Sequence, residues 1–302
     1  MTAKKYANGL FYTALLLLVI LLMESERMAD AARASLTLCA RSLIPALLVP
    51  LVLSGILSAY GGAISLPGGR LFTKAFHLPC GGLSPFLLGA LCGFPIGVKT
   101  AAELYDTGLY TEEDAMRVAA LSANTGPAFA VAGVGISFFG SARVGWCLYL
   151  IQLLSAVILG VINAKKHPLP QISEEIANNT LHISFSDILY RSSLSLLTVT
   201  GTVTFFGTFC GLFSFFMPKS ATAVIAAFLE VGNGAYYASR LPSAIGIPLA
   251  AFAISFSGIS VLFQNAALLA PRRIPIAPIV SRKLLQGALA MLITLLLLPI
   301  LQ

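Results

Sequence analysis

The stretch LCGFPIGVKTAAEL, residues 91–104, interrupts the chain halfway through an apolar segment. The apolar run before it, LSPFLLGA at residues 83–90, is far shorter than the ~20 residues that a helix needs to cross the hydrocarbon core. The run then meets glycine and proline, which break helices, and Lys99, whose charge is costly in lipid. The stretch therefore predicts a re-entrant hairpin over 83–104, which enters and leaves the membrane on one side.

The composition indicates an integral membrane protein around this break. Of the 302 residues, 57% are hydrophobic and 10% are charged, and the mean hydropathy is +0.88, whereas soluble proteins carry about 25% charged residues. The net charge of +7 fits the basic loops of membrane proteins, so no nucleic-acid partner is predicted. The scattered cysteines lack metal-ligand spacing, and GxSxG, P-loop and HExxH motifs are absent. No metal, cofactor or enzymatic activity is therefore predicted.

Apolar windows predict an all-α polytopic protein with about seven transmembrane helices and two re-entrant hairpins. The first 33 residues are expected to form an uncleaved transmembrane helix, because no small-residue cleavage site follows the apolar run. The second hairpin is expected at 221–241, where another short apolar run is broken by glycine. The crossings are expected at residues 6–23, 35–60, 116–139, 144–163, 188–216, 244–269 and 283–301.

The distribution of lysine and arginine predicts the orientation in the bilayer. With the N-terminus in the cytoplasm, thirteen of the nineteen basic residues lie inside and six lie outside. This bias agrees with the positive-inside rule. We therefore expect a cytoplasmic N-terminus and a C-terminus on the other side of the membrane.

The two hairpins belong to a predicted internal repeat. GVKTAAEL at 97–104 aligns with GAYYASRL at 234–241, and each half has the order span, hairpin, broken span, span. Three crossings are an odd number, so the second copy must be inserted upside down. We predict a first inverted repeat over 34–163, a polar linker over 164–187 and a second repeat over 188–302. Paired interrupted segments in inverted halves are typical of a transporter's midplane site.

The breaks GFPIG at 93–97 and NTGP at 124–127 predict a polar interior. Hydrocarbon cannot satisfy free backbone groups, so such breaks are tolerated only inside protein or beside a wet cavity. Half-helices that begin near Pro95 and Pro127 would direct their partly positive N-termini at this cavity, which favours an anionic or polar solute. Helix kinks that serve packing alone are the alternative.

Two charged residues accompany the breaks, and the sequence leaves their roles open. Lys99 could neutralise a substrate carboxylate, reach the membrane surface or pair with Glu103 one turn later. Glu230 opens the second hairpin and is the one acidic residue after Asp187. It could bind a coupling proton or Na⁺, bond the substrate, or pair with Arg240.

Neutral polar residues and the helix-breaking residues complete the predicted site. Side chains with hydroxyl and amide groups on the two broken spans suit a polar small molecule, and helix–helix hydrogen bonding is their alternative use. The segment YDTGLYTEEDAMR at 105–117 is instead predicted as a solvated turn in which Thr111 caps a helix. The predicted substrate-binding residues are Gly93, Phe94, Pro95, Gly97, Lys99, Ser122, Asn124, Thr125, Gly126, Glu230, Asn233, Ser255, Ser257, Gln264 and Asn265.

These motifs resemble those of a known family. The segment LLGALCGFPIGVKTAAELYDTGLYTEEDAMRVAALSANTGPAFAVAGVG at 87–135 resembles the YlbJ sporulation integral membrane proteins, also called SpoVV, of the nucleoside-recognition or Gate domain family. Residues 92–97 match the family's CGFP-x-G element. Its Ser-Asn-x-x-Gly-Pro-x-Phe element is matched by Ser122, Asn124, Gly126, Pro127 and Phe129, with Ala123 inside it. Looser similarity extends over RSLIPALLVPLVLSGIL at 41–57, SFSGISVLFQ at 255–264 and SRKLLQG at 281–287.

The resemblance implies a role in endospore formation. The family is associated with moving dipicolinic acid across the outer forespore membrane, and the Gate fold is similar to part of the concentrative nucleoside transporters. We therefore expect a transporter or facilitator of a small anionic metabolite, dipicolinic acid. The alternatives are nucleoside or nucleobase transport and a non-transporting membrane scaffold needed for sporulation. Whether the protein forms a homo-oligomer stays open.

Overall fold

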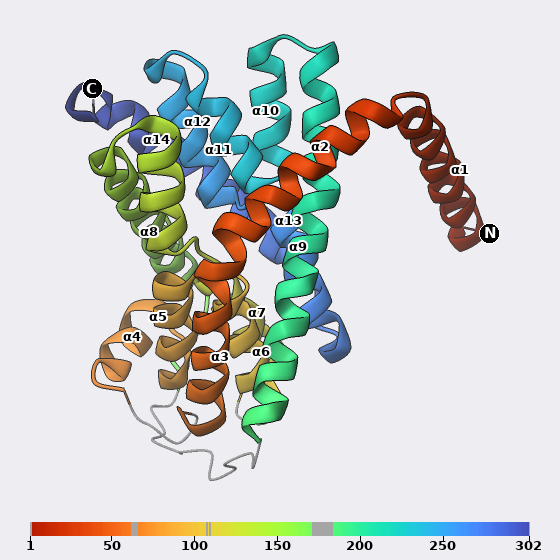
Figure 1. The fold of residues 1–302 in the computed structure, drawn as a ribbon. Helices are drawn as coiled ribbons and strands as arrows, with labels where there is room; N and C mark the ends of the chain where they lie inside the picture. The colour runs from red at the N-terminus through yellow and green to blue at the C-terminus, as the bar shows by residue number, and fades with distance from the viewer. Residues whose placement is uncertain (1, 62–65, 107, 109, 171–183, 302) are drawn as a thin grey trace.

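The computed structural model describes residues 2–61, 66–106, 108, 110–170 and 184–301 (Figure 1). These residues form helices and turns without any β-strand, which confirms the predicted all-α class. The first helices are α1 Thr2–Met23, α2 Ser25–Leu38, η1 Cys39–Leu43, α3 Ile44–Gly61, α4 Gly69–Phe76, η2 Cys80–Gly82, α5 Leu83–Cys92, α6 Ile96–Asp106, α7 Glu112–Ser122, η3 Ala128–Phe138 and α8 Ala142–Ala164. The others are α9 Phe185–Phe216, α10 Lys219–Leu229, α11 Val231–Ser239, α12 Ser243–Phe256, α13 Gly258–Leu269, η4 Ala270–Arg272 and α14 Ala277–Leu301.

The described residues include four segments that are long and apolar enough to cross a membrane, by length and composition. A fifth is added if the bent pair Gly69–Phe76 and Cys80–Cys92, which meet at 96°, counts as one span. The chain is therefore a polytopic membrane protein. The four segments are Ala142–Ala164, Phe185–Phe216, Ser243–Arg272 and Ala277–Pro299.

The seven predicted crossings compare as follows with the four to five segments found among the described residues. The first predicted crossing, residues 6–23, lies within the 22-residue helix α1. The crossing predicted at 116–139 is divided, because α7 ends at Ser122 and η3 begins at Ala128. The predicted crossing at 35–60 passes through the π-helical turn η1. The full count of seven stays a prediction.

Both predicted hairpins correspond to pairs of short helices in contact with each other. The first pair is α5 and α6, joined at Gly93, and the second is α10 and α11, joined at Glu230. Figure 1 shows α5 to α7 in the lower half of the molecule and α10 to α12 in the upper half. The long helix α9 extends from the lower half into the upper half. The inverted repeat itself stays a prediction.

Two predicted domain boundaries can be compared with the bounds of the helices. Residue 33, where the N-terminal unit was expected to end, lies inside α2, which packs on α9. The predicted linker at 164–187 begins at the last residue of α8 and includes the start of α9, and its residues 171–183 lie outside the described part of the chain. The predicted helix cap is confirmed, because the Thr111 hydroxyl accepts the backbone N–H of Asp114 at 3.1 Å.

Large apolar side chains cover the outside of the helices. On α9, Leu197 is 67% exposed and Phe205 is 58% exposed, and on α14 Leu296 is 73% exposed. Exposure of such large apolar surfaces to water is unfavourable, whereas contact with lipid tails is favourable. The outward faces of α9 and α14 therefore agree with a membrane environment.

Candidate functional site

Each hairpin tip lies against the break of a later helix pair. A Cβ atom on Gly93 would come within 2.7 Å of the Gly126 nitrogen. In the second half, a Cβ atom on Gly258 would come within 3.0 Å of the Val231 nitrogen. Backbone thus touches backbone at both places. Glycine permits this close approach because it has no side chain.

A cavity of about 330 Å³ lies beside both hairpin tips and the break between α7 and η3. It receives residues from both hairpin tips, from the break between α7 and η3, and from α2, α3, α9 and α13. Most of its lining is apolar, with a small number of polar groups, which is the usual character of a small-molecule site. The predicted site residues in its lining are Gly93, Phe94, Thr125, Gly126, Glu230 and Gln264.

Glu230 is a fully buried carboxylate in this lining, with 1% of its surface exposed. It caps α11: its oxygens accept the backbone N–H groups of Gly232 at 2.9 Å and Asn233 at 2.6 Å, and the Asn233 side-chain amide at 2.8 Å. A negative charge at a helix N-terminus is favourable. No ion pair to Glu230 occurs within the described chain, and Arg240 instead stacks on Tyr236 at 4.9 Å. The carboxylate is therefore held by hydrogen bonds alone.

Gln264 is the other polar side chain that reaches the cavity from the second half. Its Nε2 donates to the Thr202 hydroxyl at 2.7 Å, which ties α13 to α9 beside the cavity. Thr125 belongs to the first half of the chain, in the break between α7 and η3. Its hydroxyl donates to the Ile254 carbonyl at 3.0 Å. Both halves therefore contribute polar groups to one cavity.

The break between α7 and η3 is stabilised by hydrogen bonds from side chains that were not predicted from the sequence. Gln152 of α8 accepts the Thr125 N–H at 3.1 Å and donates to the Thr125 carbonyl at 3.0 Å. Lys283 of α14 is fully buried and donates to the Ala123 carbonyl. These bonds satisfy backbone groups that would otherwise be unpaired in the protein interior.

A second glutamine links these groups to Asn124. Gln286 accepts from Lys283 at 2.8 Å and donates to the Asn124 Oδ1 at 3.1 Å and to the Gln152 carbonyl at 3.1 Å. Asn124 in turn donates to the Leu121 carbonyl at 2.7 Å. Asn124 thus supports the break and does not line the cavity. A lone glutamine in the apolar run LYLIQLLSAV was the available signal for this network.

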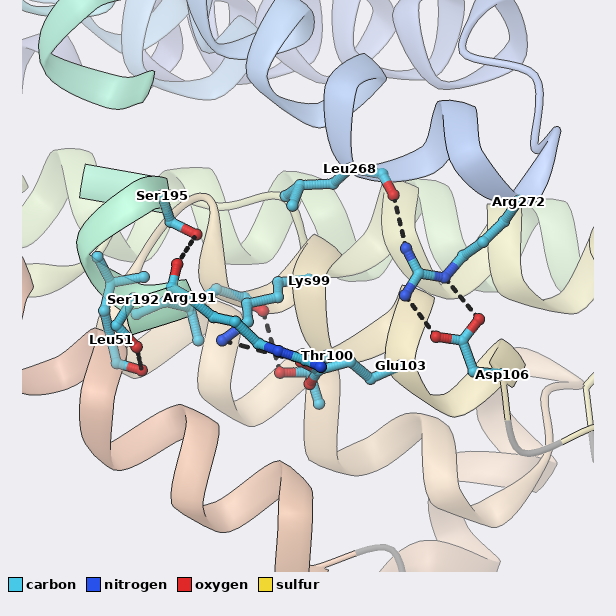
Figure 2. A network of polar contacts seen from close by, with 11 residues as sticks. Leu51, Lys99, Thr100, Glu103, Asp106, Arg191, Ser192, Ser195, Leu268 and Arg272 are labelled. Carbon is cyan, nitrogen blue, oxygen red and sulfur yellow. Dashed lines mark hydrogen bonds and ion pairs between the residues drawn. The ribbon is translucent and has the colours of Figure 1, made fainter. Parts of the chain in front are cut away.

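Lys99 lies outside the cavity lining. Its Nζ is 3.8 Å from a Glu103 carboxylate oxygen, and its side chain is 11% exposed. Figure 2 shows Lys99 directed at Glu103, with a dashed line between the two side chains. Among the roles that the sequence left open for Lys99, the structure shows the ion pair with Glu103.

Figure 2 also shows an ion pair that joins the two halves of the chain. The Arg272 guanidinium, at the end of η4, donates from Nε to an Asp106 oxygen at 2.7 Å and from Nη2 to the other oxygen. Its Nη1 donates to the Leu268 carbonyl at 2.8 Å. This forked contact fixes the end of α13 against the end of α6.

The remaining predicted residues lie near the breaks without lining the cavity. Pro95 stands at the tip of the first hairpin, and Gly97 packs against the Ser122 carbonyl, where a Cβ atom would come within 2.3 Å. Four of these predicted residues have buried polar side-chain atoms without a hydrogen-bond partner among the described residues: Ser122, Ser255, Ser257 and Asn265. Unpaired buried groups cost about 1–3 kcal/mol each. Water or a solute is therefore their expected partner, and their role in binding stays a prediction.

Comparison with known proteins gives one relative and no structural match. No protein-family model and no solved structure matches the chain. The chain is 24% identical over 322 residues to the sporulation integral membrane protein YlbJ of Bacillus subtilis (strain 168), and the match covers 89% of this chain and 77% of the relative. This match confirms the resemblance to the YlbJ family. The resemblance to YlbJ also agrees with the apolar helices of a polytopic membrane protein.

Proposed function

We propose that this chain is a membrane transporter or facilitator that moves a small anionic metabolite, dipicolinic acid, during endospore formation. The observation that carries the proposal is the cavity lined by both hairpin tips and by the break between α7 and η3, with each hairpin tip packed on a helix break. Paired breaks of this kind are typical of transporter sites. The name of the B. subtilis relative supports a setting in sporulation. The proposed location is the outer forespore membrane, with a cytoplasmic N-terminus.

The charge of the cavity places a condition on an anionic substrate. Glu230 is the one charged residue among the described residues that line the cavity. Two like charges about 4 Å apart repel by about 4 kcal/mol near a protein surface. The N-terminus of η3, where Gly126 and Ala128 line the cavity, offers only about half a positive charge.

We therefore assign Glu230 the role of coupling residue in the proposed cycle. A dianion enters when the Glu230 carboxylate has bound a proton or a cation such as Na⁺. The bound proton or cation removes the repulsion, and substrate and cation then cross together. Glu230 supplies the means of coupling, because it is the one charged side chain in the described cavity lining and intramembrane carboxylates of this kind carry protons or bind cations.

Nucleoside or nucleobase transport is a second candidate, favoured by the absence of a cation in the described cavity lining. A neutral base would use hydrogen bonds to Glu230, Gln264 and Thr125. The mostly apolar lining, which includes Phe94 and Phe129, suits an aromatic ring in either substrate.

Uptake by proteoliposomes that contain the purified chain tests the proposal. We expect saturable uptake of labelled dipicolinate above that of empty vesicles, competition by unlabelled dipicolinate, and no competition by nucleosides. Nucleoside uptake that dipicolinate does not inhibit would support the second candidate instead. Vesicles that transport neither compound would favour a non-transporting scaffold.

Replacement of Lys99 by methionine is expected to change dipicolinate uptake by no more than about twofold. The side chain pairs with Glu103 and does not line the cavity, and a partly exposed pair of this kind contributes about 1 kcal/mol or less to stability. Uptake per molecule of Lys99→Met, normalised to the amount of protein in the vesicles, checks the expectation. A tenfold loss with a normal amount of folded protein would return Lys99 to the substrate site.

A further inference from the structure

A second cavity, of about 140 Å³, shares no lining residue with the proposed transport cavity. Side chains from α4, α7, α8 and α14 line it together with residues that follow α4 and α8. Three of the lining residues are cationic: Arg117, Lys166 and Arg282. Among the described lining residues none is acidic. The cavity is therefore strongly basic.

Arg117 is fixed in place before any ligand binds. Its side chain is 4% exposed, and its two Nη groups donate to the backbone carbonyls of His77 at 3.0 Å and Phe76 at 2.8 Å. Its Nε–H has no acceptor among the described residues. Asp114 approaches one Nη only to 3.8 Å. A buried guanidinium held by neutral carbonyls keeps its positive charge, which acts on an anion in the cavity.

The acidic residues nearby are engaged outside the cavity. Glu113 lies 3.2 Å from the His167 ring and more than half of its side chain is exposed. His167 in turn contacts His77, whose Nδ1 lies 2.7 Å from the His167 carbonyl oxygen. Neither Glu113 nor Asp114 lines the cavity. An anion in the cavity would therefore face cations and neutral polar groups.

The cavity lies at the ends of two candidate spans. Lys166 lies two residues after Ala164, the last residue of α8, and Arg282 lies in the second turn of α14. Ends of spans lie at the level of the lipid headgroups. The cavity also includes Ile162 and Leu285, which are 53% and 59% exposed. Cations thus stand beside apolar side chains that face outward.

We propose that this basic cavity binds the phosphate of an anionic phospholipid. The headgroup phosphate would contact Arg117, Lys166 and Arg282, and an acyl chain would lie along Ile162 and Leu285. The volume is about ten times the ~10–15 Å³ that one water requires, so a phosphate group fits. Basic pockets between membrane helices near the headgroups bind anionic lipids in this way.

Thermal unfolding of the full chain in detergent, titrated with phosphatidylglycerol, tests this proposal. The wild type is expected to gain thermal stability in a saturable manner, and phosphatidylcholine at the same concentrations is expected to have a smaller effect. Arg282→Gln is expected to need about fivefold more phosphatidylglycerol for half of the effect. Lys219→Gln removes one exposed positive charge at the start of α10 and is expected to behave like the wild type.

Three outcomes would overturn the proposal. One is equal stabilisation by the two lipids, and another is the same half-effect concentration in wild type and Arg282→Gln. The third is stabilisation by inorganic phosphate that depends on Arg282 and competes with phosphatidylglycerol, because the site would then take a free anion. Arg282→Gln is preferred to a change at Arg117, whose bonds to Phe76 and His77 support the fold.

Discussion

Replacement of Glu230 by glutamine is expected to abolish the accumulation of dipicolinate that a pH gradient drives. If one proton crosses with each substrate, a gradient of one pH unit supports about tenfold accumulation. Glutamine resembles the protonated glutamate in shape and cannot release a proton. It also retains an oxygen that can accept one backbone N–H of α11. Glu230→Gln should therefore fold, with a loss of about 1 kcal/mol from the weaker helix cap.

Proteoliposomes with an imposed pH gradient measure this effect. In Glu230→Gln we expect the internal dipicolinate to equal the external concentration, while exchange of labelled for unlabelled substrate continues. Glu112→Gln, which changes an exposed glutamate in the first turn of α7, is the matched control and should accumulate substrate like the wild type. A parallel series with a Na⁺ gradient identifies the coupling ion. Gradient-driven accumulation that survives in Glu230→Gln would exclude Glu230 as the coupling residue.

The breaks between short helices could be predicted from the sequence because their signals are local. Short apolar runs that end on glycine or proline cannot cross a bilayer, and the structure divides the chain at Gly93 and Glu230. The lone acidic residue Glu230 could be singled out in the same way. The partners of Glu230 could not be predicted in this way. A basic side chain was one of the expected partners, but backbone N–H groups of the following helical turn bond to the carboxylate instead.

The network behind the first break could not be read in the same way because its partners are distant in the sequence. Lys283 and Ala123 are 160 residues apart, and Gln286 and Asn124 are 162 residues apart. Nothing local to Lys283 distinguishes a buried lysine from one at the membrane surface. The orientation of Lys99 had the same difficulty, since a long, flexible lysine side chain can point in several directions from its helix.

Replacement of Gly93 by alanine is expected to destabilise the fold by about 2–6 kcal/mol. Gly93 has φ 83° and ψ −172°, a conformation that is essentially limited to glycine and costs other residues about 1–3 kcal/mol. The added Cβ would also lie 2.7 Å from the Gly126 nitrogen. Backbone on both sides of the contact cannot move aside as a flexible side chain would, so overpacking adds about 1–3 kcal/mol.

Gly133→Ala is the control for this substitution, because Gly133 lines the same cavity from within η3. Its added Cβ would meet only the Phe129 ring, at 3.6 Å, which is ordinary contact. Since alanine favours helix over glycine by about 0.5–1 kcal/mol, Gly133→Ala should be as stable as the wild type or more so. Thermal unfolding in detergent and the amount of protein in the membrane compare the two variants. Equal unfolding temperatures for Gly93→Ala and wild type would mean that the tip of the first hairpin does not pack on the break at Gly126, and the cavity would lose the contact that forms one of its walls.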